Sequence, residues 1–280
     1  MRITRRELMM AAGTAALPLQ AAKLKAIGAQ LYTLRAVLPQ KPLETLKALE
    51  ALGYTEVEAV AGDLPKIWDA LKQTRMKPVS VHLDAGAFLS TPEKIPAMLD
   101  DSKARGFKFV VCPYVPPNMR SAENMKKLGE TLNKAGAQAK AAGMTLCYHN
   151  HAFEFAPLEN TTIFDRMMAE TDPKLVQLEL DIMWAKVAGL DPAAVIQKYA
   201  NRVALVHLKN VSAGVPQRFD ERVPREAFEE VGKGAIDIAS VLRASAKAGV
   251  KHYFVEQDQT PGDALASLKG SIEYLKALDY

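Results

Sequence analysis

The sequence predicts a single (β/α)₈ barrel over residues 23–280. Three observations lead to this prediction: short apolar runs alternate with amphipathic stretches, eight such pairs occur, and the length fits. The apolar runs lack the polar alternation of half-exposed strands, so we expect both faces of each strand to be buried, as in a parallel sheet. A (β/α)₈ barrel typically takes about 250 residues, which matches this segment.

The expected elements follow one another regularly along the chain. The strands, each rich in Val, Ile, Leu or aromatic residues, are expected at Ile27–Tyr32, Glu56–Val60, Val79–Leu83, Phe109–Cys112, Thr145–His149, Gln177–Asp181, Val203–Leu208 and Tyr253–Glu256. Helical patterns lie between them, among them Pro42–Leu52, Pro92–Arg105, Ser121–Ala142 and Ile236–Ala248. A glycine follows each of these four helices, at Gly53, Gly106, Gly143 and Gly249. Glycine accepts the left-handed conformation that closes a helix.

A doubly wound sheet is the alternative arrangement of alternating strands and helices. It would have a glycine-rich phosphate-binding turn after the first strand, whereas the turn here reads Thr33-Leu34-Arg35-Ala36. The longest irregular stretch, Asn210–Lys233, is long enough to act as a lid over a site. Because no domain linker interrupts the alternation, we expect one barrel domain.

Composition excludes several classes of protein. The 280 residues are 49% hydrophobic and 24% charged, which is typical of globular rather than disordered or fibrous chains. The formal net charge of +4 is too small to indicate a nucleic acid as partner. Two cysteines, Cys112 and Cys147, provide neither a disulfide framework nor a cysteine-type zinc site.

Residues 1–22 have the pattern of a cleaved export signal. Arg5 and Arg6 precede a stretch without charge from Leu8 to Leu19, which is shorter than the about 20 residues that a membrane-spanning helix needs. The arginine pair resembles the twin-arginine signal, which exports proteins already folded. We therefore expect a periplasmic or secreted protein that is free of the membrane once the signal is removed. A helical terminus with chance arginines is the alternative.

Polar residues end most of the expected strands, and a (β/α)₈ barrel forms its active site at these carboxyl ends. Asp181, His207 and Glu256 each follow a mostly apolar run on three successive strands. A carboxylate in an apolar barrel needs a cation or a shifted pKa, because burial removes its solvation. Imidazole and carboxylates around one axis suit a divalent ion such as Mn²⁺, Co²⁺, Zn²⁺ or Fe²⁺. These strand ends predict one divalent metal ion.

Six segments at the strand ends occur in a characteristic order. They are Gly28-Ala29-Gln30-Leu31-Tyr32, Gly53-Tyr54-Thr55-Glu56-Val57-Glu58, Tyr148-His149-Asn150-His151, Asp181-Ile182-Met183-Trp184, Val206-His207-Leu208-Lys209 and Val255-Glu256-Gln257-Asp258. Together they resemble the xylose isomerase-like TIM barrels, the sugar phosphate isomerase/epimerase group, over essentially the whole chain after the signal. The resemblance implies a small-molecule carbohydrate as substrate and leaves a homo-oligomer open.

The resemblance also implies a ligand set, because members of the group commonly bind one divalent metal with Glu, Asp, His and Glu from strands five to eight. The last three of these ligands correspond to Asp181, His207 and Glu256. The first corresponds to His149, six residues after the glycine that opens strand five. A histidine thus stands where the epimerases have a glutamate that also moves protons. Glu154 is then expected to serve as the base or to approach the metal itself.

The other residues at the strand ends are expected to contact the substrate. Glu256 is the second candidate base, and Lys209 is expected to hydrogen-bond a substrate oxygen unless it is a solvent-exposed rim lysine. The expected substrate-binding residues are Gln30, Glu58, His82, His151 and Trp184. Trp184 stands where the ketose epimerases have a histidine. It therefore suggests stacking against a sugar unlike a simple ketohexose.

The resemblance implies a metal-dependent sugar isomerase or epimerase that acts on a keto sugar through an enediolate. In such a reaction the metal binds two neighbouring oxygens, the C–H beside the carbonyl becomes acidic, and a carboxylate removes its proton. Loss of a β-oxygen after the same first step would make the protein a lyase or dehydratase on keto-glycosides or keto-inositols. The sequence leaves these outcomes open.

Two functions of other classes are also considered. An exported barrel that binds carbohydrate without turnover would result if His149 marks a decayed site. The same superfamily includes endonucleases that cut DNA at abasic sites with three zinc ions. Trp184 and Pro113-Tyr114 stand where some of the additional His and Asp ligands would be expected, and the low net charge also argues against DNA as substrate.

Overall fold

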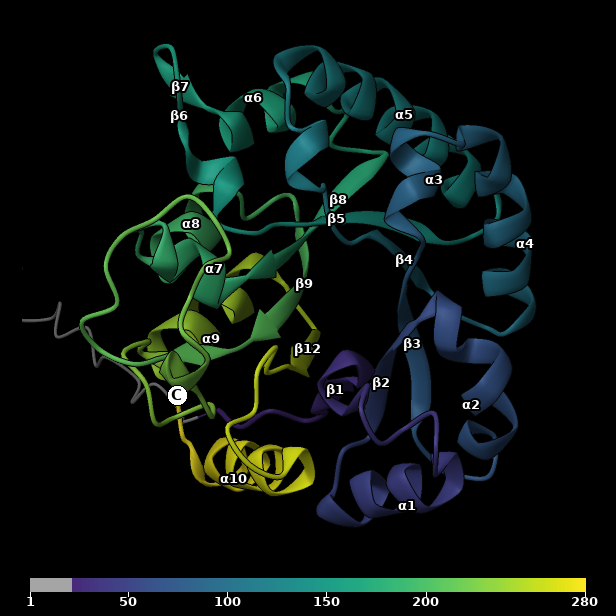
Figure 1. Ribbon diagram of the computed structural model, residues 1–280, viewed down its shortest axis with the longest axis vertical. Coiled ribbons are helices and arrows are strands. Elements are labelled where there is room, and N and C mark those ends of the chain that lie inside the picture. The colour runs from purple at the N-terminus through teal and green to yellow at the C-terminus, as the bar shows by residue number, and fades with distance from the viewer. Residues whose placement is uncertain (1–21) are drawn as a thin grey trace, which may run out of the picture.

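The computed structural model describes residues 22–280, in which eight parallel strands close into a barrel surrounded by helices (Figure 1). The strands follow the order β1-β12-β9-β8-β5-β4-β3-β2 around the barrel. The predicted single (β/α)₈ barrel is confirmed. The expected export signal, residues 1–22, lies outside the described residues apart from Ala22. Within residues 22–280, no helix is both long enough and apolar enough to span a membrane.

The barrel strands lie close to their predicted positions. They are β1 (Gly28–Gln30), β2 (Glu56–Val60), β3 (Lys77–His82), β4 (Phe109–Cys112), β5 (Thr145–His149), β8 (Val176–Asp181), β9 (Val203–Leu208) and β12 (His252–Val255). The first strand is shorter than predicted, because Leu31–Leu34 forms a 3₁₀ helix. The Gln30 side chain accepts a hydrogen bond from the Tyr32 backbone N–H at 3.0 Å, which stabilises the turn away from the strand.

Helices follow the strands and cover the outside of the barrel. They are α1 (Pro42–Leu52), α2 (Leu64–Leu71), α3 (Ala85–Leu89), α4 (Ile95–Ala104), α5 (Ala122–Ala141), α6 (Ile163–Glu170), α7 (Ile182–Val187), α8 (Pro192–Lys198), α9 (Ile238–Ala248) and α10 (Ala264–Ala277). Gly53 and Gly249 close α1 and α9 with φ of 102° and 84°, as predicted. Helix α9 begins later than predicted because the Asp237 side chain caps it, accepting a hydrogen bond from Ser240 N.

Part of the barrel interior is apolar. One layer of buried side chains fills it, formed by Val79, Val111, Cys147, Leu205 and Phe254. Filling the interior in this way makes the barrel a packed core rather than a pore. Buried polar side chains are therefore concentrated above this layer, toward the carboxyl ends of the strands.

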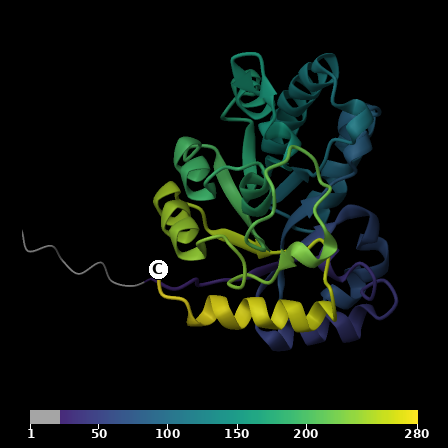
Figure 2. The same ribbon diagram turned by 60° about the vertical axis from the view of Figure 1, so that its left-hand side comes forward.

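The predicted lid segment leaves the barrel after β9 and returns before α9. Two short antiparallel strands pair at its base, β10 (Asn210–Val211) and β11 (Phe228–Glu229). Figure 2 shows the connection between them as a long loop outside the barrel strands. Arg120, which lies before α5, holds this loop: its Nη2 donates to Glu221 Oε1 at 2.8 Å.

Candidate metal and substrate site

Three neighbouring strands bring the predicted metal ligands together. Asp181 on β8 is the register partner of His207 on β9, and Glu256 follows directly after β12, the neighbour of β9. One ligand atom from each of these three buried residues lies within 4.8 Å of the others. His149 ends β5 on the other side of β8, and its Nε2 lies 3.7 Å from Asp181 Oδ2.

We call His149, Asp181, His207 and Glu256 the mouth cluster. Its donors are two imidazole nitrogens and two carboxylates, and His207 Nδ1 lies 2.8 Å from Glu256 Oε2. A mixed nitrogen and oxygen set of this kind fits a divalent ion such as Mn²⁺, Co²⁺, Zn²⁺ or Fe²⁺. The residues present therefore fit the metal that the sequence predicts.

Lys209 lies beside the mouth cluster and is buried. Its Nζ is 2.8 Å from Asp181 Oδ2, 2.7 Å from Glu256 Oε2 and 2.9 Å from Asp258 Oδ2. Burial alone would lower the pKa of Lys209, but the carboxylates of Asp181, Asp258 and Glu256 raise it well above its usual value. Lys209 is therefore a charged component of the site, and the alternative of a solvent-exposed rim lysine is excluded.

A second group of polar side chains lies against the mouth cluster inside the barrel. We call Glu58, His82 and Glu179 the inner cluster. His82 Nε2 lies 2.7 Å from Glu179 Oε2 and 3.1 Å from Glu58 Oε1. Burial lowers the pKa of His82, but these two carboxylates raise it to about 10. Glu58 Oε2 and Glu179 Oε1 are buried and have no hydrogen-bond partner among the described residues.

A cavity of about 430 Å³ opens above the two clusters. This volume lies within the range of small-molecule sites, about 300–1,000 Å³. Aromatic side chains form much of its wall, and polar groups line its floor and sides. The lining includes Tyr32, Tyr114, Trp184, Phe228, His82, His149, His151, Lys209, Glu256, Asp258 and, from the lid segment, Glu221 and Val223.

The predicted substrate-binding residues divide into two groups. His82, His151 and Trp184 line the cavity. Gln30 and Glu58 are fully buried and do not line it, because Gln30 Nε2 donates to Glu58 Oε1 at 2.7 Å within the barrel. In this geometry Gln30 and Glu58 bond each other rather than line the cavity, so their expected role in substrate binding stays a prediction.

Glu154 also lies away from the cavity. Its Oε1 accepts a hydrogen bond from the Tyr148 hydroxyl at 2.7 Å, and its Oε2 accepts one from the His151 backbone N–H at 2.8 Å. Burial raises the pKa of Glu154 to about 8. Since both oxygens point into the protein and Glu154 does not line the cavity, the geometry does not support it as a base or metal ligand.

Glu179 was not among the predicted site residues, because it lies two residues before the end of β8 rather than at the strand end. Side chains alternate along a strand, so Glu179 shares the inward face of β8 with Asp181. The sequence did contain a signal for Glu179. It stands two residues before the predicted ligand Asp181, in a strand expected to be buried on both faces. Asp258, in the loop after β12, belongs to the site through its contact with Lys209.

Comparisons with known proteins agree with this architecture. A family model described as xylose isomerase-like TIM barrel matches residues 46–278. The chain belongs to the xylose isomerase-like TIM barrel family. The resemblance that the strand ends predicted is thereby confirmed for the fold and family.

The proteins to which this chain is similar have different activities in their names. The inosose dehydratase of Geobacillus thermodenitrificans is 34% identical over 167 residues, 56% of this chain and 54% of that protein, so the match spans about half the length of the relative. A sugar phosphate isomerase/epimerase from Parabacteroides distasonis superimposes with a TM-score of 0.76, at 22% identity over 90% of this chain and 98% of that one. The IolI protein, solved with a zinc atom, has a TM-score of 0.68 at 18% identity, again over 90% and 98%. The two structures show the common fold.

Proposed function

We propose that this protein is a divalent-metal-dependent lyase that eliminates water or another β-oxygen substituent from a cyclic keto polyol. Keto-inositols and keto-glycosides are the substrate classes that we favour. Isomerisation or epimerisation of a keto sugar through the same enediolate is the second candidate, since a structural relative carries the name isomerase/epimerase. The 34% identity to a protein named inosose dehydratase supports the lyase.

The observation that carries this proposal is the make-up of strand five. Epimerisation removes a proton from one face of the substrate and returns it to the other, and in the related epimerases a strand-five glutamate takes part. Here β5 ends in His149, and Glu154 faces away from the cavity. Elimination needs one base and a hydrogen-bond donor at the leaving oxygen. The ammonium of Lys209, which lies in the cavity wall among three carboxylates, is the candidate for this donor.

The mouth cluster would hold the metal through His149, Asp181, His207 and Glu256. A divalent ion bound there would act as a Lewis acid on the substrate carbonyl, which makes the neighbouring C–H acidic. The orientation of the Asp181 carboxylate is fixed by two backbone N–H groups. Its Oδ1 accepts hydrogen bonds from Met183 N and Trp184 N at 2.9 and 3.1 Å. These bonds leave Oδ2 to face the other ligands.

Two residues in the cavity wall are candidates to accept the proton. Glu256 Oε2 is already contacted by His207 and Lys209. His151 is the less engaged group, because its Nδ1 has no hydrogen-bond partner in the part of the chain that the structure describes. Burial lowers the pKa of His151 well below its usual value, so its imidazole is neutral but a weaker base than that of an exposed histidine. Glu154 then acts indirectly, by holding the His151 backbone.

Aromatic walls and the lid segment complete the substrate site. Trp184 and His151 lie with ring centroids 5.5 Å apart, and Tyr114 packs edge-on against His151 at 5.0 Å. Apolar faces of this kind pack against the C–H groups of a six-membered ring and exclude water from the reacting centre. They suit a cyclic polyol better than an open-chain sugar.

Proton exchange and elimination can be measured separately. Metal-loaded protein is incubated in D₂O with a keto-inositol, a 3-keto-glycoside and a ketohexose, while NMR follows C–H exchange and ultraviolet absorbance follows a conjugated enone product. We expect metal-dependent exchange together with enone formation. An epimer without enone would favour the second candidate, and binding without exchange would indicate a carbohydrate-binding module. Lys209→Met should keep exchange but slow elimination about 10²–10⁴-fold, the range for losing an acid or base group.

We also propose that the protein is exported by the twin-arginine route. The support is the sequence pattern around Arg5 and Arg6, which lies outside the described residues. Residues 1–22, fused to a reporter that is active only after export in the folded state, should deliver it. Arg5→Lys combined with Arg6→Lys should stop delivery, and unchanged delivery would remove this proposal.

A further inference from the structure

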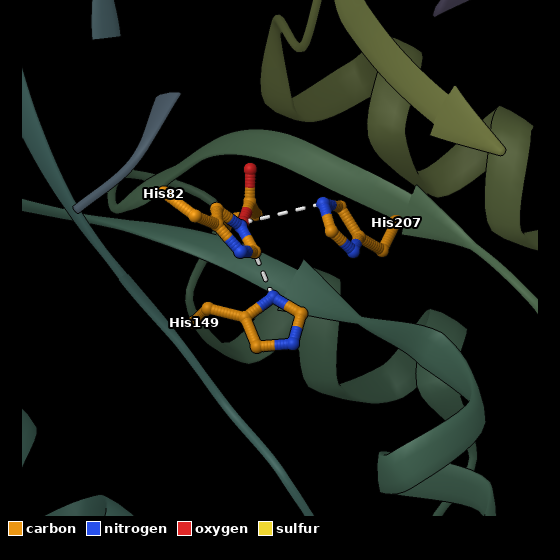
Figure 3. A group of neighbouring side chains, drawn as sticks. His82, His149 and His207 are labelled. Carbon is orange, nitrogen blue, oxygen red and sulfur yellow. Dashed lines mark hydrogen bonds and ion pairs between the residues drawn. The ribbon is translucent and has the colours of Figure 1, made fainter. Parts of the chain in front are cut away.

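Three imidazoles converge on one carboxylate oxygen inside the barrel. Glu179 Oε2 lies 2.7 Å from His82 Nε2, 3.1 Å from His149 Nδ1 and 3.3 Å from His207 Nε2. Figure 3 shows the three rings turned toward this common point. All four side chains are buried, and the low local dielectric strengthens these contacts.

The two histidines of the mouth cluster turn opposite ring nitrogens toward the inner cluster. His149 directs Nδ1 to Glu179 and leaves Nε2 toward Asp181. His207 directs Nε2 to Glu58 Oε1 at 2.6 Å and leaves Nδ1 toward Glu256. In a neutral imidazole only one nitrogen carries a hydrogen, and the other offers a lone pair. A carboxylate that accepts the hydrogen at one nitrogen therefore makes the other nitrogen available to a metal.

The alternative is a second metal ion held by His82, His149, Glu179 and His207, whose ligand atoms also lie within 4.8 Å of one another. At the centre of the three imidazoles, however, lies the Glu179 oxygen itself, at hydrogen-bond distance from His82 and His149. His207 Nε2 is bonded at 2.6 Å to Glu58 as well. A second ion would have to displace these contacts, so the number of bound ions distinguishes the two arrangements.

We propose that Glu179, supported by Glu58 and His82, is a positioning residue that sets the ring orientation and tautomer of His149 and His207. The ring of His149 is thereby held with Nε2 directed to the metal. The ring of His207 is held with Nδ1 directed to the metal. This inference rests on the metal site of the proposed function and goes beyond it by giving the inner cluster a role. His82 joins the two carboxylates, and its ring stacks on that of His207 at 5.5 Å with an interplanar angle of 9°.

The test is metal affinity, measured with Zn²⁺ alone by competition with a chelating indicator. Glu179→Leu removes the acceptor, and Glu179→Gln keeps the shape and an acceptor oxygen but removes the charge. We expect Kd for Zn²⁺ to rise about 10–100-fold in Glu179→Leu, as is typical when such a partner of a metal-bound histidine is lost, and less in Glu179→Gln. Glu56→Gln is the matched control, because Glu56 contacts His252 rather than a metal-binding histidine. It should leave Kd unchanged.

A second measurement separates positioning from general loss of structure. Nitrogen-15 NMR of the Zn²⁺-bound full chain should show metal at His149 Nε2 and at His207 Nδ1, with hydrogen on the opposite nitrogens. Glu179→Gln, which conserves the volume, should weaken the hydrogen signal at His149 Nδ1 while circular dichroism stays that of the wild type. Unchanged Kd and tautomers in this variant would overturn the inference.

Two further outcomes would also overturn it, and they distinguish this inference from the proposed function. Two equivalents of Zn²⁺ in the wild type, one of them lost in Glu179→Gln, would make the inner cluster a metal site. No Zn²⁺ uptake by the wild type would remove the metal-dependent function together with this inference. Normal uptake with no elimination of any substrate would remove only the function.

Discussion

Each end of the barrel has a glutamate paired with a histidine, yet the two ends differ in their surroundings. At the amino-terminal end, Glu56 Oε2 lies 2.8 Å from Nδ1 of the half-buried His252. At the carboxyl end, His207 is buried between Glu58 and Glu256, and Lys209 contacts three carboxylates. The first is an isolated pair, and the second is a buried network.

The comparison shows what distinguishes a structural pair from a cation site. Glu56 and His252 contact each other near solvent, so the Glu56 carboxylate needs no metal ion to balance its charge. At the carboxyl end the buried carboxylates of Glu58, Glu179, Asp181 and Glu256, together with the partly exposed Asp258, gather around one lysine and the histidines. Buried like charges are unfavourable unless cations balance them. An excess of buried acid groups, rather than any one Glu–His contact, is therefore the feature that indicates a metal.

The largest effect is expected from the mouth cluster. Asp181→Asn keeps the side-chain oxygen that caps α7 but loses a charged ligand, so the chain should fold and lose most bound metal and exchange activity. Elemental analysis should find about one equivalent in the wild type and much less in the variant. His252→Gln, at the other end, should retain the metal. Equal metal content in the two variants would contradict the difference between the two ends of the barrel.

Lys209→Met should destabilise the metal-free protein strongly. Removing one partner of a buried ion pair typically costs about 3–5 kcal/mol, because the remaining charges lose their counter-ion. Glu56→Gln should cost only about 1 kcal/mol or less, since that pair lies partly in solvent. Chemical unfolding of both variants checks the difference. Similar losses would mean that Lys209 does not balance the carboxylates.

The next effect concerns the lid. Arg120 Nη2 holds Glu221 of the lid segment, so Arg120→Met should loosen the cover of the cavity. We expect KM to rise roughly tenfold, equivalent to about 1.4 kcal/mol of binding, with little change in kcat. Arg222→Met is the control, because Arg222 lies on the same segment but pairs with Asp220 in solvent. An unchanged KM in Arg120→Met would show that this contact does not hold the substrate site closed.

The smallest effect is a pH dependence at Glu154. Burial raises its pKa to about 8 from an ordinary 4.5, so the folded chain keeps a proton that the unfolded chain loses. This contribution disfavours folding as pH rises from about 5 to about 8. Urea unfolding should therefore show Glu154→Gln gaining stability relative to the wild type over this range. A difference that does not change with pH would contradict the buried, uncharged state of Glu154.

The sequence predicted the fold, and that Asp181, His207 and Glu256 lie together, because both depend on local patterns. Apolar runs and closing glycines such as Gly53 locate the strands and helices, and the carboxyl ends of parallel strands must meet. Burial depth was not predictable in this way. Gln30 and Glu58 were expected in the cavity, but they bond each other inside the barrel. Whether a side chain faces a cavity or a neighbour depends on packing between strands distant in sequence.

The most direct test of the metal site is an anomalous-scattering map of crystals grown with Mn²⁺ or Zn²⁺. The account predicts one peak, coordinated by His149 Nε2, Asp181 Oδ2, His207 Nδ1 and Glu256 Oε2, with Glu179 bonded to the far side of His149. A peak among His82, Glu179 and the two other imidazoles, or no peak within reach of Asp181, would contradict it.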